Sequence, residues 1–372
     1  MSDIVRAALA AVVEGETLSM DQARAAMGSV MEGEATPAQL AALLVALRMR
    51  GETIEELAGF AAAMRERVLR VEAPVGTVDT CGTGGDRSGT FNISTTAALV
   101  VAAAGIPVAK HGNRAVTSRS GSADVLEALG VRTDHDAASA GEALRTEGFA
   151  FMFAPGFHPA MRHAGPTRRE IGVRTAFNLL GPLTNPAGAR RQVVGVGDAA
   201  AAPRLAAVLR LLGVERGLIV HGDGIDELPL DGSGVLYDVT PEGVERRAVT
   251  PEEMGLRRAA TSELAGGTPE ENARIVEAVL DGESGPRRDV VLLNAGAAIL
   301  ASGRAESIPA GIAMAAAAID EGRTTRLLVR LRAERHAALE ARAALEARAA
   351  LEAATAEAAE ASAGHAGEAA RT

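Results

Sequence analysis

The sequence is poor in cysteine and in aromatic residues, and each shortage restricts what the protein can be. Among its 372 residues there is one cysteine and no tryptophan, and aromatic residues make up 2%. A single thiol cannot form a disulfide within the chain, which is usual for proteins of a reducing cytoplasm, so we expect a cytoplasmic location. With so few aromatic rings, the hydrophobic core must consist of closely packed Ala, Val and Leu.

The chain also lacks an excess of basic residues and a long apolar segment. Its 38 Lys plus Arg stand against 48 Asp plus Glu, a formal net charge of -10, whereas a nucleic-acid-binding surface normally needs a basic patch. No uninterrupted apolar run reaches the roughly 18 residues that a membrane span requires. The first residues lack the basic and apolar regions of a secretory signal. We therefore expect neither a nucleic-acid partner nor a membrane partner.

Lysine is nearly absent too, because Lys110 is the only one and every other basic position is arginine. Lysine is a compact point charge with three donors, whereas arginine is a planar fork. A crowded phosphate site could demand the smaller group, although chance survival in an arginine-rich chain is the alternative. Lys110 follows a strand-like segment and precedes a polar loop, and this position favours a role in a site.

Two polar, glycine-rich segments enclose one apolar segment with helical character. The first runs from Asp79 to Thr95 and contains Gly82-Thr83-Gly84-Gly85-Asp86; the second runs from Lys110 to Asp124. Glycine allows backbone N–H groups to approach a ligand closely, and several such groups at a helix start favour an anion. Phosphate is the anion that we expect.

The first 72 residues have the pattern of a small all-helical domain. Capping boxes begin at Ser19, Thr36 and Thr53, and each precedes apolar residues at helical spacing. Such a domain could simply complete the fold, or it could close over a ligand.

From residue 73 to residue 332, short β-rich runs alternate with helical ones. The expected strands are 75–79, 106–109, 149–153, 192–196, 217–221 and 290–294, and the expected helices are 94–104, 123–129, 137–145, 200–212, 269–280 and 309–321. This alternation predicts an α/β domain with a mostly parallel central sheet. Ligands of such sheets bind beyond the carboxyl ends of the strands, where both glycine-rich segments are expected.

Residues 158–186 interrupt this alternation with arginines, histidines and prolines. We expect residues 160–190 to leave the sheet and pack on the helical domain. Arginines there could pair with a carboxylate bidentately. A surface hinge with solvated arginines is the alternative.

Two acidic residues, Asp226 and Glu227, follow the expected strand 217–221. Carboxylate oxygens beside a phosphate site suit Mg²⁺, which is usually held by one or two carboxylates together with substrate phosphates. A solvated acidic turn is the alternative for this segment alone.

The last forty residues, 333–372, repeat Leu-Glu-Ala-Arg-Ala-Ala, with leucines at 339, 345 and 351. A spacing of six turns successive leucines by roughly 240°, so no apolar stripe forms. We expect an extension that is solvated helix or disorder and carries no chemistry.

Taken together, the segments Gly82–Asp86, Asn92–Thr95, Lys110–Arg114, Ser120–Asp124, Arg174-Thr175, Phe177–Leu183 and Asp226-Glu227 closely resemble the anthranilate phosphoribosyltransferase family. The resemblance covers residues 5 to 330, with the motifs in the family's order. It implies the nucleoside-phosphorylase-like class III phosphoribosyltransferase fold, a homodimer formed through the helical domain, and Mg²⁺ as the cofactor. The implied reaction joins anthranilate to phosphoribosyl pyrophosphate, giving N-(5-phosphoribosyl)anthranilate and pyrophosphate in tryptophan biosynthesis.

The resemblance also implies roles for individual residues. The phosphoribosyl pyrophosphate contacts would be Gly82, Gly85, Asp86, Thr90, Asn92, Ile93, Ser94, Thr95, Lys110, His111, Gly112, Asn113, Arg114, Ala115, Val116, Thr117, Ser118 and Ser122. The Mg²⁺ ligands would be Ser94, Asp226 and Glu227. Gly82, Asn113 and Arg168 would contact anthranilate, with His111 and Pro182 lining its pocket. Lys110, Arg168 and His111 are the candidate catalytic residues, His111 being a weak candidate for a general base.

Two other functions are compatible with parts of this pattern. A pyrimidine nucleoside phosphorylase shares the fold, but its lysine loop typically reads Lys-His-Ser, whereas here it reads Lys110-His111-Gly112. A non-catalytic, nucleic-acid-binding relative would show a basic surface and loss of the metal and anthranilate positions, and the sequence shows neither.

Overall fold

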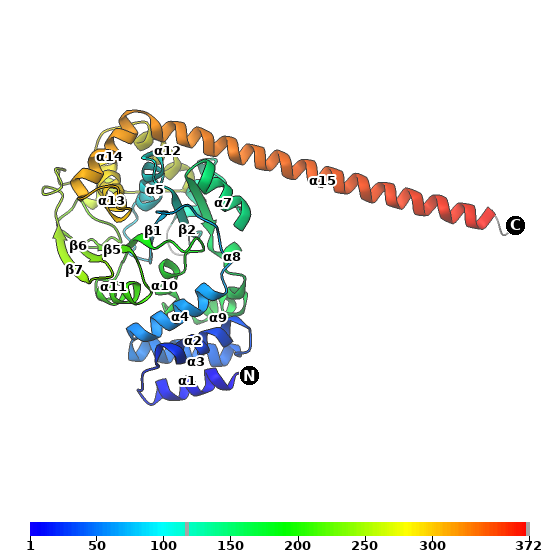
Figure 1. Ribbon diagram of the computed structural model, residues 1–372, viewed down its shortest axis with the longest axis horizontal. Coiled ribbons are helices and arrows are strands. Elements are labelled where there is room, and N and C mark those ends of the chain that lie inside the picture. The colour runs from blue at the N-terminus through cyan, green and yellow to red at the C-terminus, as the bar shows by residue number, and fades with distance from the viewer. Residues whose placement is uncertain (116–118, 370–372) are drawn as a thin grey trace.

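The computed structural model describes residues 1–115 and 119–369, with side chains as far as residue 349. The chain forms a helical bundle, a larger α/β domain and a long helix that projects from it (Figure 1). A small helical domain beside a larger, mostly parallel α/β domain is the architecture that the sequence predicts, and this prediction is confirmed. No helix in the described part of the chain has the length and apolarity to cross a bilayer.

Four helices form the N-terminal bundle: α1 (Asp3–Val13), α2 (Met20–Met31), α3 (Pro37–Arg50) and α4 (Ile54–Glu66). The capping boxes that begin at Ser19, Thr36 and Thr53 are present at the starts of α2, α3 and α4. In each, a side-chain oxygen accepts from a backbone N–H that the helix leaves unpaired. The local sequence therefore determines where these helices begin.

The α/β domain is built on seven strands: β1 (Val78–Gly82), β2 (Val108–Gly112), β3 (Phe149–Phe153), β4 (Arg191–Gly195), β5 (Arg216–His221), β6 (Gly234–Val239) and β7 (Val244–Val249). Their order in the sheet is β3-β2-β1-β4-β5-β6-β7. Strands β1 to β5 are parallel, and β6 and β7 add an antiparallel edge. The strand order reverses between β1 and β4, which places a binding crevice at their carboxyl ends.

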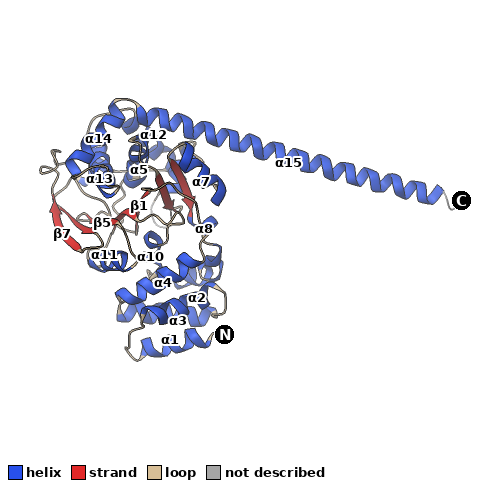
Figure 2. Cartoon of the chain, in the orientation of Figure 1, coloured by secondary structure: helices blue, strands red, loops and turns tan. Residues whose placement is uncertain are grey.

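Helices cover both faces of this sheet (Figure 2). The longer ones are α5 (Ile93–Ala103), α6 (Ser122–Ala128), α7 (Ala137–Thr146), α11 (Ala202–Leu211), α12 (Pro269–Leu280), α13 (Pro286–Ala301) and α14 (Ile308–Asp320). Val193, Leu218 and Val220 join the core formed with α5, α13 and α14, whereas Val194 and Ile219 join the core shared by α11 and the bundle. Alternate side chains of β4 and β5 thus serve opposite faces, as strand geometry requires.

The expected strand at 290–294 is wrong, because these residues lie within α13. The segment is fully buried, so its apolar run lacks the polar face that would reveal helical periodicity. The hairpin of β6 and β7 was not expected from the sequence. The other expected strands and helices correspond to elements of the structure, with bounds shifted by a few residues.

Short elements connect the two domains: α8 (Ala154–Phe157), α9 (Gly165–Ile171), α10 (Phe177–Leu180) and the 3-10 turns η1 (Pro159–His163) and η2 (Gly181–Leu183). A third 3-10 turn, η3 (Thr261–Leu264), precedes α12 in the α/β domain. In the connecting region η1 lies against α2, α9 against α3 and α10 against α4. The segment between β3 and β4 therefore leaves the sheet, packs on the bundle and returns to the sheet.

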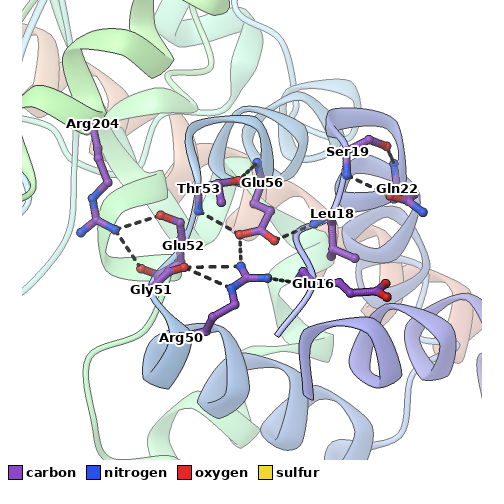
Figure 3. Close-up of polar contacts among 10 residues, drawn as sticks. All are labelled: Glu16, Leu18, Ser19, Gln22, Arg50, Gly51, Glu52, Thr53, Glu56 and Arg204. Atoms are coloured by element: carbon purple, nitrogen blue, oxygen red, sulfur yellow. Dashed lines mark hydrogen bonds and ion pairs between the residues drawn. The ribbon is translucent and has the colours of Figure 1, made fainter. Parts of the chain in front are cut away.

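A polar network fixes the bundle on the α/β domain (Figure 3). The buried Glu56 carboxylate accepts from the backbone N–H groups of Leu18 and Thr53, both at 2.9 Å, and pairs with Arg50. Next to it, Arg204 of α11 donates to the backbone oxygen of Glu52 at 2.9 Å. The Glu56 contacts fix the segments before α2 and α4 within the bundle, because a buried carboxylate is stable only when its oxygens are satisfied. The Arg204 contact with Glu52 is the part of this network that joins the bundle to the α/β domain.

The C-terminal helix α15 (Arg323–Ala369) leaves the body after its first turns (Figure 1). Leu327, Leu328 and Leu331 are buried in the main core, whereas Leu339 and Leu345 are exposed. The described side chains beyond residue 338 therefore present no packed apolar face, in keeping with their six-residue spacing.

Candidate active site

The carboxyl ends of β1 and β4 lie side by side, with Gly82 opposite Gly195. The loop after β1, residues 83–92, begins with a hydrogen bond from Thr83 N to Gly195 O of 2.8 Å. A side chain at residue 82 would place its Cβ 2.7 Å from Oδ2 of Asp226. Any larger residue at position 82 would therefore require the Asp226 carboxylate to move.

The next residues of this loop are held from two directions. Gly84 N donates to Asp226 Oδ2 at 3.1 Å, and Gly84 O accepts from Arg174 Nη1 at 2.8 Å. Gly85 has a φ of +77°, and the Arg174 guanidinium occupies the position of any Cβ added there. The positive φ disfavours other residues at position 85, and an added Cβ would require the Arg174 guanidinium to move.

The second half of the loop pairs with the chain that leads into α12. Phe91 N donates to Leu264 O at 3.0 Å, and Gly266 N donates to Gly89 O at 2.9 Å. Between the two halves, Arg87 has a φ of 62° and is the one non-glycine residue with positive φ in the described part of the chain. Such strain persists only where the surroundings determine the conformation.

These loops enclose a cavity of about 370 Å³. Its walls are the β1 loop, the starts of α5 and α6, the β5 loop and the segment before α12. The predicted phosphate-contacting residues among its lining are Gly82, Gly85, Asp86, Thr90, Asn92, Ile93, Ser94 and Ser122. The predicted metal ligands Ser94, Asp226 and Glu227 also lie in this lining.

The two carboxyl groups of the β5 loop, Asp226 and Glu227, are partly buried and line the cavity near Asp86. Burial, and then the neighbouring Asp86, raise the pKa of Asp226 to about 7; burial, and then Asp226, raise the pKa of Glu227 to about 8. Glu227 Oε1 accepts from Ser94 N at 3.1 Å. Closely placed acids in a buried site favour a cation, and their oxygens are the type that Mg²⁺ prefers. Among the described residues, however, no three His, Cys, Asp or Glu side chains form a ready-made metal cluster.

Lys110 lies behind the cavity wall rather than in its lining. The side chain is 1% exposed, and Nζ donates to the backbone oxygen of Thr80 at 2.6 Å. Burial lowers the Lys110 pKa, while the negative charge of Asp79, Glu227 and Asp226 opposes this effect. The ammonium is therefore placed to offset the buried carboxyl groups.

Several of the predicted phosphate contacts lie outside the lining of the first cavity. Arg114 is half exposed and pairs with Asp124 at 3.0 Å and with Glu127 at 2.6 Å, and Ala115 N donates to Asp124 Oδ2 at 2.9 Å. Thr95, from α5, is fully buried and donates to Ser122 Oγ at 3.2 Å. Arg114, Ala115 and Thr95 are thus outside the cavity lining, and the predicted contacts Val116, Thr117 and Ser118 lie outside the described residues.

A second cavity, of about 700 Å³, lies between the α/β domain and the bundle. Its lining is more apolar and includes the predicted residues Gly82, His111, Gly112, Asn113, Arg168 and Pro182. Gly82 lines both cavities. The two cavities are therefore adjacent at the end of β1.

Arg168 is the distinctive cation of the second cavity. Its guanidinium lies 4.6 Å from the centre of the Phe177 ring, and burial lowers its pKa. No carboxylate pairs with Arg168 in the described part of the chain. A half-buried, unpaired guanidinium stacked on a ring is well suited to bind a planar carboxylate.

Two histidines, His111 and His158, share this cavity as a tilted pair with ring centres 5.1 Å apart. Burial, and then His158, lower the pKa of His111 to about 3, and burial lowers that of His158 to about 4. Both rings are therefore neutral at pH 7, and each is a weak base.

Sequence reasoning missed several residues that the structure places at the site. Arg119, Gly266, Gly267 and Asn272 line the first cavity, and Asn178 lines the second. The dipeptide Gly266-Gly267 before a capping box at Thr268 is a local signal for a tight approach. The segment that Gly266 approaches, at Gly89 and Phe91, is more than 170 residues away, and nothing in the local sequence shows that these two segments meet.

Comparison with known proteins agrees with this architecture. Residues 75–325 match the family model "Glycosyl transferase family, a/b domain", and residues 6–68 match "Glycosyl transferase family, helical bundle domain". An anthranilate phosphoribosyltransferase of Symbiobacterium thermophilum is 53% identical over 335 residues, covering 89% of this chain and 98% of that protein. One of Thermomicrobium roseum is 51% identical over 344 residues, covering 91% and 99%.

Solved structures give the same result. The crystal structure of anthranilate phosphoribosyltransferase from Thermus thermophilus is similar with a TM-score of 0.84 and 48% identity, covering 88% of this chain and 99% of that one. The Saccharomyces cerevisiae enzyme in complex with PRPP and Mg is similar with a TM-score of 0.83 and 26% identity, covering 91% and 99%.

Proposed function

Because this chain belongs to the anthranilate phosphoribosyltransferase family, we propose that it transfers the 5-phosphoribosyl group from phosphoribosyl pyrophosphate to the amine of anthranilate. The products are N-(5-phosphoribosyl)anthranilate and pyrophosphate, in tryptophan biosynthesis. Neither alternative, a pyrimidine nucleoside phosphorylase or a nucleic-acid-binding relative, is supported by the relatives described above.

The observation that carries this proposal is the meeting of two unlike cavities at Gly82. One is lined by backbone amides, hydroxyls and carboxyl groups, as a sugar diphosphate with a metal ion would need. The other is apolar with an unpaired arginine, as an aromatic acid would need. A reaction between C1 of the sugar and the aromatic amine requires this adjacency.

The predicted contacts to phosphoribosyl pyrophosphate remain our assignment for the first cavity. Gly82, Gly85, Asp86, Thr90, Asn92, Ile93, Ser94 and Ser122 would bind it directly. Lys110 and Thr95 would act from behind the wall, and residues 111–118 remain predicted contacts. The bare amides of the β1 loop and the start of α5 favour the negative charge of the phosphates.

We propose Mg²⁺ as the cofactor, with Ser94, Asp226 and Glu227 as its protein ligands. The hydroxyl and carboxylate oxygens fit this ion, and a nearby cation would stabilise the charged forms of both acids, whose pKa values are raised. When bound, Mg²⁺ would supply positive charge to the departing diphosphate.

The transfer breaks the bond between C1 and the pyrophosphate oxygen and forms a bond between C1 and the anthranilate nitrogen. The bonding electrons leave with pyrophosphate, and the nitrogen then loses a proton to solvent or to a nearby acceptor. Arg168 would hold the anthranilate carboxylate so that the amine faces C1, with Gly82 and Asn113 beside it. We assign no general base, because His111 has a pKa of about 3 and is a poor proton acceptor.

We further propose that the protein is a cytoplasmic homodimer that associates through its bundle. Val13 of α1 and Val45 and Met49 of α3 are exposed apolar side chains on that domain, which association through the bundle would bury. The single cysteine, Cys81, supports a reducing compartment.

A fluorescence assay that follows anthranilate consumption tests the function directly. We expect consumption only when phosphoribosyl pyrophosphate and Mg²⁺ are both present, with release of one pyrophosphate per anthranilate. Phosphate-dependent cleavage of a pyrimidine nucleoside in place of this reaction would refute the proposal.

A further inference from the structure

Asn272 of α12 links three segments around the first cavity. Its side chain is 2% exposed, and Nδ2 donates to Oδ1 of Asn92 at 2.9 Å, across 180 residues of sequence. Asn92 in turn contacts Ser120 of the loop before α6 through two hydrogen bonds. Segments from β1, β2 and α12 therefore converge on one amide.

Two backbone groups determine how both amides are oriented. Gly267 N donates to Oδ1 of Asn272 at 2.7 Å. Because a backbone N–H can only donate, the accepting atom is oxygen, and the amide nitrogen of Asn272 must face Asn92. Independently, Nδ2 of Asn92 donates to the backbone oxygen of Ser120 at 3.1 Å. Because a carbonyl oxygen can only accept, the amide nitrogen of Asn92 must face Ser120, and its Oδ1 therefore faces Asn272.

This orientation decides what Asn92 presents to the cavity. Its Oδ1 accepts from Asn272 Nδ2 and from Ser120 Oγ at 3.2 Å, so both lone pairs are used. Its Nδ2 carries two hydrogens, and one of them binds Ser120 O. The second has no acceptor within the described part of the chain. Since Asn92 lines the cavity, this N–H is a donor available to an anion.

The surrounding backbone is shaped for this arrangement. A Cβ on Gly266 would lie 2.7 Å from the backbone nitrogen of Phe91 and 2.8 Å from Oδ1 of Asn272. The bridge between Thr90 and Ala265 lies alongside. Only a glycine lets the segment before α12 approach the β1 loop closely enough for the two asparagines to meet.

We infer that Asn272 is a positioning residue for the sugar-diphosphate donor: it holds the Asn92 amide with an N–H directed to a phosphate oxygen. Without it, Asn92 is held from the Ser120 side alone, and its free N–H is no longer fixed in the direction of the phosphate. This inference rests on the proposed function, since the anion is the diphosphate of that reaction.

Two variants of Asn272 separate amide orientation from added charge. Asn272→Asp still accepts from Gly267 N but cannot donate to Asn92, and its carboxylate lies against Asn92 Oδ1 and opposes the orientation that Ser120 holds. Asn272→Leu also removes the donor and adds no charge. Thr268→Ala is the matched control, because it removes the side-chain oxygen that caps α12 at Glu271 N and leaves both asparagines intact.

The measurements are the Kd of inorganic pyrophosphate with Mg²⁺ by calorimetry, the KM values of both substrates, and Tm. Loss of a hydrogen bond to a charged group predicts pyrophosphate binding and donor KM at least about tenfold weaker in both Asn272 variants, with anthranilate KM unchanged. Thr268→Ala should lower Tm and leave pyrophosphate binding unchanged.

The outcomes distinguish the inference from the function beneath it. If wild type binds pyrophosphate and catalyses transfer while both variants bind pyrophosphate as tightly as wild type, the positioning role is wrong. Equal losses for anthranilate and the donor would also overturn it, because they indicate general disruption. If wild type neither binds pyrophosphate nor consumes anthranilate, the proposed function itself fails, and the inference fails with it.

Discussion

Arg174 donates from Nη1 to the backbone oxygen of Gly84 at 2.8 Å, and its guanidinium fills the space beside residue 85. Arg174 precedes α10, which lies against α4 of the bundle. The Arg174 side chain thus joins the segment that borders the second cavity to the β1 loop, which borders the first cavity. We expect the conformation of the β1 loop to depend on this contact.

A double-mutant cycle tests that dependence. Gly85→Ala should raise the donor KM for two reasons, a positive φ that costs about 1–2 kcal/mol for alanine and a clash with Arg174. In an Arg174→Ala background only the first cost remains, so the effect of Gly85→Ala should be smaller. Gly89→Ala is the control, because Gly89 has a φ of +70° but no neighbour within 4 Å of an added Cβ. Additive effects of Gly85→Ala and Arg174→Ala would contradict the expected coupling.

The single lysine provides a test of charge against shape. We expect Lys110→Arg to reduce kcat by at least about tenfold although the charge is kept, because a planar guanidinium cannot replace a buried ammonium on Thr80 O. Lys110→Met leaves the neighbouring buried carboxyl groups uncompensated and should cost about 3–5 kcal/mol in the free energy of unfolding. Steady-state kinetics and urea unfolding measure the two effects. A rate for Lys110→Arg within about threefold of wild type would argue against the need for a compact cation.

The buried histidine pair predicts a pH-dependent stability. Burial lowers the pKa of His158 to about 4, whereas an unfolded histidine titrates near 6.5. Between about pH 6.5 and about pH 4, His158 is protonated in the unfolded chain but neutral in the folded chain. The free energy of unfolding should therefore decrease as the pH falls through this range. Between pH 7 and pH 5, wild type should lose about 2 kcal/mol more than His158→Asn in urea unfolding.

The control for this experiment is a histidine that folding leaves in solvent. The His336 side chain is 76% exposed and contacts the exposed Glu340 of the same helix, so His336→Asn should lose nearly as much stability as wild type over the same pH range. If His158→Asn also follows wild type, the buried ring is not the source of the pH dependence.

How much of this protein could be predicted depends on whether a feature is local in the sequence. The capping box at Thr36 and the glycine loop at Gly82 each consist of residues within a few positions, and both occur where expected. Residues 290–294 were assigned to a strand because a short, fully buried apolar run looks the same in a helix and in a strand.

Contacts between distant segments were beyond the reach of such reasoning. Asn272 is an ordinary residue of an amphipathic helix in the sequence, and its role arises only when α12 lies beside the β1 loop. Likewise, the sequence suggested a role for Lys110 in the phosphate site, but the contact between its Nζ and Thr80 O could not be predicted from it. Side-chain direction within a strand is decided by the packing of the neighbouring strands and helices.

Arg168 offers the sharpest separation of the two substrates. Removing its guanidinium should raise the KM of anthranilate by about ten- to a hundredfold, since a charge-assisted pair with a carboxylate contributes about 1.5–3 kcal/mol, while the donor KM should stay unchanged. Aniline has the same amine but no carboxylate, so its slow transfer should be nearly equal in wild type and in Arg168→Ala. Kinetics with both acceptors therefore isolate the carboxylate contact. If Arg168→Ala kept the anthranilate KM and raised that of the donor, the arginine would have to be assigned to the diphosphate instead.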